Sequence, residues 1–224
     1  MNHPSLSTAG LLSLERTRAA ALFSECTYPW EALPRIASFA QALGQSLDAA
    51  QFVERSPGVY VHVTAKIAPT ASIEGPCIID EGAEIRHCAY IRGSAIIGKG
   101  AVVGNSTELK NCVLFDECQV PHYNYVGDSI LGYRAHMGAG SVLSNVRADK
   151  ANISVKIAGE SIETGLRKFG AVLGDDAEIG CNAVLNPGTI VGRHAQIYPT
   201  SCVRGTVPEG TIYKANGQSA KREI

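Results

Sequence analysis

Large aliphatic residues recur at every sixth position along most of the chain, and small residues stand four places after most of them. An amphipathic helix would repeat near every 3.6 residues and a half-buried strand every second residue, so neither explains this period. The spacing instead predicts short strands joined by tight turns, each directing one large and one small residue inward. The aliphatic positions are Ile67, Ile73, Ile79, Ile85, Ile91, Ile97, Val103, Leu109 and Phe115, then Leu131, Met137 and Leu143, then Leu173, Ile179, Leu185, Val191, Ile197 and Val203.

This six-residue pattern resembles that of the hexapeptide-repeat proteins. The resemblance implies a left-handed parallel β-helix in which three hexads form one triangular coil of about 18 residues. Successive coils would then rise by about one strand spacing, ~4.8 Å, so that the aliphatic column becomes a continuous core. We therefore predict an all-β solenoid over residues 58–213.

The chain before the repeats has helical spacing instead. Residues 5–25 are rich in Leu, Ala, Glu and Arg and predict one helix. The stretch YPWEALPRIASFAQALG predicts a second, with its apolar residues on roughly one face. We predict that residues 1–57 form an N-terminal helical segment. Since the open end of a solenoid exposes a sheet edge that needs cover, we expect Trp30 to pack against the first coil.

Two further stretches leave the repeat. Between Leu143 and Leu173 the distance fits whole hexads, but most inward positions would be polar, with Asp149 among them. Long loops in compact folds are usually functional or disordered, so we predict an excursion loop at about residues 147–169. Residues 214–224 are expected to form a C-terminal tail.

The period also fails in the stretch VPHYNYVGD, which begins at Val120. Apolar positions resume at Val126 and Leu131, after two steps of five. This predicts that one coil is two residues short beside His122, which would push a side chain outward. The alternative is that Pro121 forces a kink and that His122 is an incidental surface residue. Spacing alone leaves both interpretations open.

Composition removes several classes of function. The formal net charge of −1 does not indicate a general binder of nucleic acid or membrane surfaces. No apolar run approaches the length of a membrane span, and the start MNHPSLSTAG lacks the features of a signal peptide. The seven cysteines include no CxxC pair, so we expect reduced thiols in a cytoplasmic protein.

A second resemblance is more specific. The stretch VGNSTELKN…VPHYNYVGDSILGYRAHMGAGS resembles the acetyltransferase domain of the bacterial bifunctional glucosamine-1-phosphate acetyltransferase / N-acetylglucosamine-1-phosphate uridyltransferase, and the match extends from about Ile85 to Val207. The whole chain is similar to standalone UDP-N-acetylglucosamine pyrophosphorylase-related proteins. Residues 1–57 are too few for a nucleotide-binding α/β domain and contain no LxxGxGTR-type loop, so we expect no nucleotidyltransferase domain.

The resemblance implies a CoA-dependent N-acetyltransferase that acts on an amino-sugar phosphate. His122 falls on the family's catalytic base, and imidazole is suited to accepting a proton near neutral pH. Arg92 and Lys110 fall on positions that bind the sugar phosphate, where cations make charge-assisted hydrogen bonds. Tyr125 falls on another phosphate-contacting position.

Four further residues take their expected roles from the same resemblance. Asn145 falls on an asparagine at the acetyl-CoA site, and Lys168, in KFGAVLGDD, takes the place of a substrate-binding lysine. His136 stands where the family has a sugar-contacting asparagine, and Cys181 replaces a serine near the thioester. The family's final arginine, which binds the coenzyme phosphates, has no clear counterpart; the candidates are Lys214, Lys221 and Arg222.

The resemblance also implies an assembly and a co-substrate. In the family the site lies between the subunits of a homotrimer, acetyl-CoA is the co-substrate and no metal is expected. Aliphatic residues outside the predicted core column are consistent with packing against a neighbouring subunit. These are Ile78, Ile96, Val102 and Leu114.

The spacing of two cations supports an anion site independently. Arg92 and Lys110 are 18 residues apart, so a regular coil would stack one directly on the other. Like charges in neighbouring strands destabilise a sheet, which suggests that an anion lies between them.

Two alternatives remain open from the sequence. The first is a non-catalytic module that binds a sugar phosphate or nucleotide sugar and partners a separate nucleotidyltransferase. The second is a zinc enzyme of the β-helical carbonic anhydrase type, for which His87, His122 and His136 are the available imidazoles. Their separations do not match whole coils of 18 residues.

Overall fold

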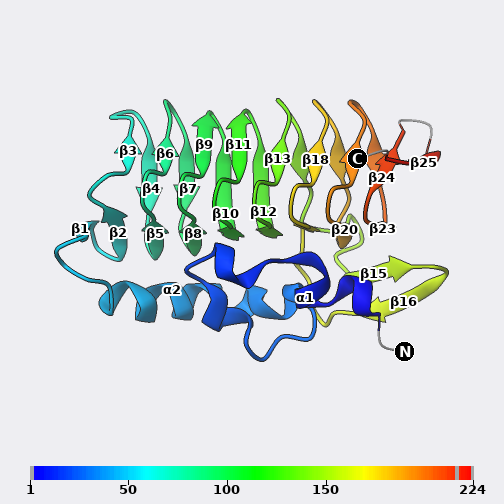
Figure 1. The fold of residues 1–224 in the computed structure, drawn as a ribbon, viewed down its shortest axis with the longest axis horizontal. Coiled ribbons are helices and arrows are strands. Elements are labelled where there is room, and N and C mark those ends of the chain that lie inside the picture. Colours follow the sequence, from blue (N-terminus) through cyan, green and yellow to red (C-terminus); the bar gives the residue numbers. More distant parts are fainter. Residues whose placement is uncertain (1–2, 215–216, 223–224) are drawn as a thin grey trace.

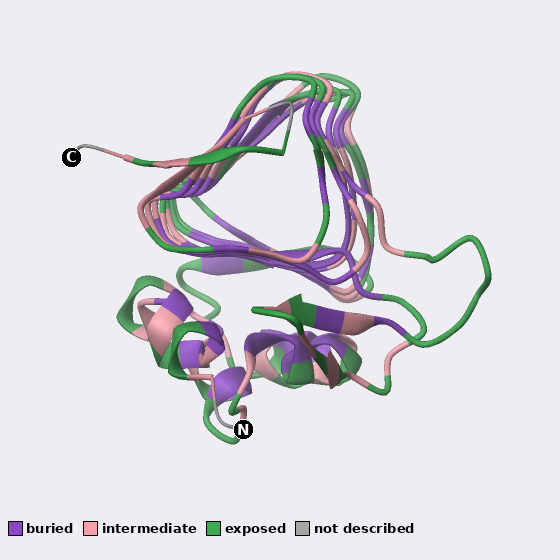
Figure 2. Cartoon of the chain, turned by 90° about the vertical axis from the view of Figure 1, so that its right-hand side faces the viewer, coloured by how far each residue is buried: buried purple, intermediate pink, exposed green. Residues whose placement is uncertain are grey.

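The computed structural model describes residues 3–214 and 217–222. Most of the chain forms a stack of parallel strands (Figure 1), which is a three-sided prism when viewed along its axis (Figure 2). The prism is a left-handed parallel β-helix of about nine turns. Each strand pairs with the equivalent strand of the next coil, so the backbone hydrogen bonds run along the prism axis. The predicted all-β solenoid is confirmed.

Two of the three faces belong to one 14-stranded sheet and the third to a nine-stranded sheet. One face of the larger sheet lies under the N-terminal segment, and we call it the covered face. It consists of β2 (Val59–His62), β5 (Cys77–Ile79), β8 (Ala95–Ile97), β17 (Ala171–Leu173), β20 (Thr189–Val191), β23 (Thr206–Val207) and the C-terminal parts of β10 (Glu108–Leu114) and β12 (Tyr125–Leu131). The open face consists of β4 (Ser72–Glu74), β7 (Tyr90–Arg92), β14 (Val142–Leu143), β19 (Val184–Leu185), β22 (Cys202–Val203) and the N-terminal parts of β10 and β12. The third face consists of β3 (Lys66–Ile67), β6 (Glu84–Ile85), β9 (Val102–Asn105), β11 (Gln119–His122), β13 (His136–Met137), β18 (Glu178–Ile179), β21 (Gln196–Ile197), β24 (Thr211–Tyr213) and the antiparallel β25 (Ser219–Lys221).

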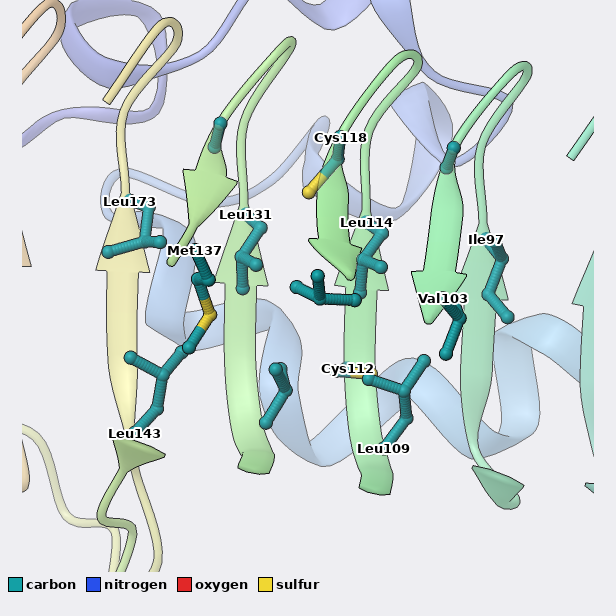
Figure 3. Packing of buried hydrophobic residues seen from close by; sticks show 14 of the residues in the cluster. Ile97, Val103, Leu109, Cys112, Leu114, Cys118, Leu131, Met137, Leu143 and Leu173 are labelled. Atoms are coloured by element: carbon teal, nitrogen blue, oxygen red, sulfur yellow. The ribbon is translucent and has the colours of Figure 1, made fainter. Parts of the chain in front are cut away.

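The interior of the prism is filled by one aliphatic residue from each strand (Figure 3). The predicted column is present with one exception, since Leu114 occupies the interior where the spacing pointed to Phe115. Phe115 instead lies outside the prism, in the cluster under the N-terminal segment, where its ring packs 5.8 Å from that of Phe23. The exception arises because the step from Leu109 to Leu114 has five residues.

The break in the period is therefore placed differently from the prediction. Two successive coils are each one residue short, at the corners that follow Lys110 and Gly127, and register pairs Leu109 with Val126 and Leu114 with Leu131. His122 lies in a stretch of regular six-residue steps between these corners. One coil earlier, the same corner has two residues with positive φ, Gly93 and Ser94 (φ 78° and 53°). Each short corner uses one, Asn111 (φ 49°) or Asp128 (φ 47°).

The N-terminal segment lies along the covered face (Figure 2). It contains η1 (Pro4–Leu6), α1 (Thr8–Leu11), η2 (Leu14–Arg16), η3 (Ala20–Phe23), η4 (Pro29–Arg35) and α2 (Ile36–Gln45), followed by β1 (Phe52–Ser56), which pairs with β2. The expected continuous helix over residues 5–25 is wrong. Carbonyls that a helix would use internally accept hydrogen bonds from the prism instead, since Asp175 N–H donates to Leu11 (3.1 Å) and Asp116 N–H to Arg16 (3.0 Å).

The aliphatic row on the covered face packs against this segment and not against a neighbouring subunit. Ile78 and Ile96 are buried beneath Leu33, Ile36 and other residues of the segment. Leu114 points into the interior, so of the four aliphatic residues expected at a subunit contact only Val102, which is half-buried on β9, stays on an uncovered face. Since the chain covers this face itself, a contact with another subunit would use the remaining two faces.

Trp30 also lies elsewhere than expected. Its ring stacks on Tyr28, with centroids 4.5 Å apart, and packs 5.9 Å from Phe169. It therefore joins the N-terminal segment to the residues that precede β17, and it does not cover the first coil. At that end β1 occupies the sheet edge.

Residues 147–169, expected to form an excursion loop, contain an antiparallel hairpin of β15 (Ser154–Ile157) and β16 (Glu160–Glu163). Ile153 and Val155 at its base are buried against the covered face. No helix in the described part of the chain is long and apolar enough to cross a membrane.

Candidate functional site

Residues whose side chains point away from the prism interior form a column along one edge of the open face. This is the edge next to the short corners that follow Lys110 and Gly127. Strand register places Arg92, Lys110, Gly127 and Ser144 at the same position of four successive coils. Arg92 Nη1 lies 2.7 Å from Glu108 Oε1, and Lys110 Nζ lies 3.5 Å from Asp128 Oδ2. Because each cation has its own carboxylate, the two do not require a bound anion, and the inference from their spacing fails.

Asp128 organises the side chains around Lys110. Its carboxylate is buried and accepts hydrogen bonds from Asn111 Nδ2 (2.9 Å) and Asn145 Nδ2, in addition to the contact with Lys110. Asn111 Nδ2 also lies 3.3 Å from the carbonyl of Leu33 in the N-terminal segment. Asp128 can reach all of these groups because the short corner turns its backbone through a positive φ.

Gly127 is buried, and it allows two side chains to pack close to its backbone. A Cβ atom here would lie 2.6 Å from the Tyr125 hydroxyl and 2.8 Å from Asn145 Nδ2, so any side chain would displace both. Burial raises the pKa of Tyr125, and the carboxylates of Glu108 and Asp128 raise it further. Its hydroxyl therefore keeps its proton near neutral pH and can donate a hydrogen bond to an anion bound beside it.

His122 lies at the corner between the third face and the open face. Its backbone is fixed, since its N–H donates to Asn124 Oδ1 and its carbonyl accepts from Gly140 N–H, both at 3.0 Å. Asn124 is buried, and its Nδ2 donates to the Gly138 carbonyl at 2.8 Å. The His122 ring is exposed and has no hydrogen bond or ion pair with any described residue. A rigid corner thus presents a free imidazole.

Cys181 shares this corner with His122. The His122 carbonyl accepts a hydrogen bond from Gly140 N–H in the next coil (3.0 Å). In the coil after that, Asn182 N–H donates to the Ala139 carbonyl (2.9 Å). Cys181 therefore lies two coils from His122, about 10 Å along the axis at the spacing of parallel strands. Its thiol is exposed.

His136 and Lys168 lie apart from this corner. His136 is on β13 of the third face, and its Nδ1 lies 2.8 Å from Glu178 Oε2, a hydrogen bond that raises the pKa of the imidazole. Lys168 is exposed and precedes Phe169, whose N–H donates to the Asn145 carbonyl (3.0 Å). Lys168 therefore stands beside the Asp128 network.

The sequence-predicted residues thus fall into three groups within one chain. Arg92, Lys110, Tyr125 and Asn145 gather at one edge of the open face, with Lys168 alongside. The second group, His122 and Cys181, lies at the opposite edge, and His136 lies on the third face. The strand between the edges has about three residues, so the edges are about 10 Å apart.

Sequence reasoning missed Asp128, Asn111 and Gly127. The signal for them was the short corner, where Asn111 and Asp128 stand at the corner that Gly93 and Ser94 form one coil earlier. Sequence reasoning placed the shortened coil beside His122, so it did not draw attention to the corners at Asn111 and Asp128.

The three histidines considered for zinc are not brought together. His87 lies two coils below His122 on the same corner, with Asn105 between them, because one coil has 18 residues and the next 17. Its Nδ1 lies 2.7 Å from Thr70 Oγ1, while His136 pairs with Glu178. Among residues 3–214 and 217–222, no three His, Cys, Asp or Glu side chains form a group that could hold a metal ion.

The chain matches a protein-family model and several known sequences. The family model of the GMPPB C-terminal domain matches residues 73–169. The chain is 34% identical over 174 residues to a bifunctional sugar-1-phosphate nucleotidylyltransferase/acetyltransferase of Sulfurisphaera tokodaii, covering 70% of the chain and 43% of that protein. It is 32% identical to the bifunctional protein GlmU of Methanococcus aeolicus, covering 68% and 41%. The chain therefore spans about two fifths of the length of these bifunctional relatives.

A third relative is matched over most of its own length. The uncharacterized acetyltransferase YaiX of Escherichia coli is 31% identical over 160 residues, which cover 71% of the chain and 70% of that protein.

Among solved structures, a hexapeptide transferase family protein from Anaplasma phagocytophilum aligns with a TM-score of 0.42 at 18% identity, covering 75% of the chain and 81% of that protein. The acetyltransferase domain of PglB from Neisseria gonorrhoeae, solved with acetyl coenzyme A, aligns with a TM-score of 0.37 at 16% identity, covering 73% and 57%.

Proposed function

Because the chain belongs to the hexapeptide-repeat acetyltransferase family, we propose that it transfers an acetyl group from acetyl-CoA to the amine of an amino-sugar phosphate such as glucosamine 1-phosphate. The observation that carries this proposal is that Lys110, Tyr125 and Asn145 gather around Gly127 at one edge of the open face, a group we call the cradle, while an unpaired imidazole stands at the other edge.

The cradle suits the phosphate of the acceptor. Lys110 and the Tyr125 hydroxyl lie near Gly127, and Arg92 stands one coil from Lys110. A phosphate that reaches the two cations would replace Glu108 and Asp128 as their partners in charge-assisted hydrogen bonds, and Tyr125 would donate a neutral one. Lys168, beside Asn145, would add a further cation.

The free imidazole suits the proton transfer. As the amine nitrogen attacks the thioester carbonyl, a C–N bond forms and the C–S bond breaks. His122 takes the proton that the nitrogen loses, and the proton then passes to the departing thiolate of CoA. Asn145 and Cys181 are the residues we assign to the acetyl end of the coenzyme, and His136 to the sugar.

The separation of these groups supports a site shared between subunits. One sugar phosphate cannot reach Lys110 and His136 of the same chain, since they lie on different faces. Of the seven exposed large hydrophobic residues in the described part of the chain, four lie on the open face or its corners, where a second copy could cover them. They are Tyr90, Tyr123, Val184 and Tyr198. We therefore propose a cytoplasmic homotrimer in which the His122 corner of one subunit faces the Lys110 cradle of the next.

The test is acetyl transfer by the purified chain. Acetyl-CoA is supplied with glucosamine 1-phosphate, galactosamine 1-phosphate, glucosamine 6-phosphate or glucosamine, and the N-acetylated product is measured by mass spectrometry. We expect turnover with a sugar 1-phosphate at a KM of about 1 μM to 1 mM, and little with glucosamine. If no acceptor is acetylated and calorimetry detects no binding of acetyl-CoA, the proposal is wrong. Binding of a sugar phosphate without transfer would favour the non-catalytic module.

A further inference from the structure

A pocket of about 610 Å³ lies between the base of the β15–β16 hairpin and the open face, next to the cradle. Its size falls within the range of small-molecule sites in proteins. One wall comes from three successive coils at Ser144, Asn186 and Arg204, and the other from residues 146–156. Since Ser144 precedes Asn145, the pocket opens directly beside the Asp128 network.

The hairpin wall is fixed to the prism. Thr206 Oγ1 donates to the carbonyl of Lys156 at 2.8 Å. Ile153, at the base of the hairpin, is 1% exposed, and its Cγ2 lies where a Cβ on Gly188 would come within 2.7 Å. The pocket is therefore preformed within one chain.

Two cations line the pocket without a carboxylate partner. Arg204 is exposed and makes no hydrogen bond or ion pair with any residue the structure describes, and Lys156 Nζ donates to Ser161 Oγ (2.9 Å). Arg147, by contrast, is paired with Asp149 at 2.6 Å. The lining also includes the apolar side chains of Val146, Ile153 and Pro187. An apolar surface beside unpaired cations fits a flat ring that carries phosphates.

The pocket and the cradle lie on one line. Strand register continues the outward column from Lys110 through Gly127, Ser144 and Asn186 to Arg204. Four coil spacings separate its ends, about 19 Å at ~4.8 Å each. The middle of the column carries only small or short polar side chains, so an extended ligand can lie along it between the two cationic ends.

We propose that this pocket binds a nucleoside pyrophosphate group, with Arg204 and Lys156 on the phosphates and the base against Val146 and Pro187. Acetyl-CoA is the expected source, and its pantetheine arm would then run along the column toward Asn145. This inference rests on the proposed function. It assigns the phosphate contacts of the donor to Arg204 on the prism and Lys156 on the hairpin, and not to Lys214, Lys221 or Arg222.

The test is calorimetric titration of the full chain with CoA, with pantetheine and with UDP. Charge-assisted hydrogen bonds predict that Arg204→Glu weakens CoA binding by about 10- to 100-fold and leaves pantetheine binding unchanged. Lys156→Glu should act in the same direction, and Arg204→Lys should retain most of the affinity. Lys66→Glu, a charge reversal at an exposed position on β3, is the matched control and should have no effect.

The three ligands distinguish CoA from a nucleotide sugar as the source of the pyrophosphate group. They also distinguish failure of this inference from failure of the proposed function. A loss confined to UDP would identify a nucleotide sugar as the source of the same group. If CoA binds the unmodified chain and both charge reversals leave CoA and UDP binding unchanged, this inference is overturned while the proposed function stands. If CoA does not bind the unmodified chain at all, the proposed function fails with it.

Discussion

At the scale of single residues, the Asp128 carboxylate holds three other side chains of the candidate site in place. It accepts hydrogen bonds from Asn111 and Asn145 and contacts Lys110, although it is only 5% exposed. A buried carboxylate is costly unless such partners compensate for its lost hydration. The network therefore orients the cradle and stabilises the fold together.

Replacing Asp128 by asparagine should disturb both properties. The amide has the same size but must direct one N–H₂ group toward other donors, which leaves a buried group unsatisfied. We expect Asp128→Asn to lower the free energy of unfolding by about 1–3 kcal/mol and to raise the acceptor KM more than it lowers kcat. Urea unfolding and steady-state kinetics measure the two effects.

The matched control for this substitution is Glu81→Gln. Glu81 forms an exposed pair with Lys99 (3.2 Å), so the change should cost less than about 0.5 kcal/mol and leave KM unchanged. Equal effects of the two variants would contradict the role assigned to Asp128.

His136 gives the site region a stability that depends on pH. The hydrogen bond that His136 Nδ1 donates to Glu178 raises the pKa of His136 above its usual 6.5, against a smaller opposing effect of burial. A raised pKa means that the pair contributes fully below about pH 6.5 and that the contribution is lost as pH rises through the folded-state pKa. Both side chains are more than a third exposed, so the contribution should stay below about 1 kcal/mol.

We therefore expect His136→Gln to destabilise the protein more at pH 5.5 than at pH 9. Urea unfolding at the two pH values measures the difference, and Glu178→Gln should reproduce it. A cost that is larger at pH 9 would show that the pair is not the cause.

At the scale of elements, the six-residue spacing predicted the strands because each coil must bury one aliphatic residue per face. The same spacing could not locate the short corners, since Leu114 and Phe115 are both apolar and only packing decides which one points inward. The N-terminal helix failed for a related reason. Residues 5–25 have helical propensity, but their backbone carbonyls accept hydrogen bonds from the prism instead of forming a continuous helix. These long-range hydrogen bonds cannot be predicted from the local sequence.

The same limit applied to the candidate site. Motif resemblance named Lys110, Tyr125 and Asn145, which the fold brings together. It missed Asp128, because the role of a corner residue depends on a one-residue difference in coil length. It also could not show that His136 lies on another face.

The N-terminal segment is tied to the prism by a buried ion pair. Arg18 Nε and Nη2 donate to the two carboxylate oxygens of Asp80 at 2.6 and 2.8 Å, and Asp80 is 1% exposed. Arg18→Leu would leave that carboxylate unpaired, so we expect a loss of about 3 kcal/mol in the free energy of unfolding. Thermal and urea unfolding measure it.

The double variant Arg18→Leu/Asp80→Leu is the informative comparison, because it removes both charges. It should be more stable than Arg18→Leu alone. If the double variant is less stable by the sum of two independent losses, the ion pair is not what anchors the segment.

At the scale of the whole molecule, one face of the prism is covered by the chain itself and two are left for assembly. A cyclic trimer that uses the open face and its corner would place His122 of one subunit beside the Lys110 cradle of the next. Neither half of such a site would work without a partner.

Mixing inactive variants tests this arrangement. His122→Ala and Lys110→Ala subunits are unfolded together and refolded at equal amounts. A shared site predicts recovery of about one quarter of the wild-type activity, since random assembly pairs two intact halves at that frequency. Each variant refolded alone should stay inactive. No recovery in mixed trimers of normal mass would mean that one chain supplies both residues.

The central claim is that His122 removes the proton from the attacking amine, and the most direct measurement is the kcat of His122→Ala with acetyl-CoA and a sugar 1-phosphate. General-base catalysis predicts a fall in kcat of about 10²- to 10⁴-fold with little change in either KM. Val63→Ala, a truncation of an exposed residue outside the proposed site and subunit contact, serves as the control and should retain its kcat. A His122→Ala enzyme with wild-type kcat would contradict the account.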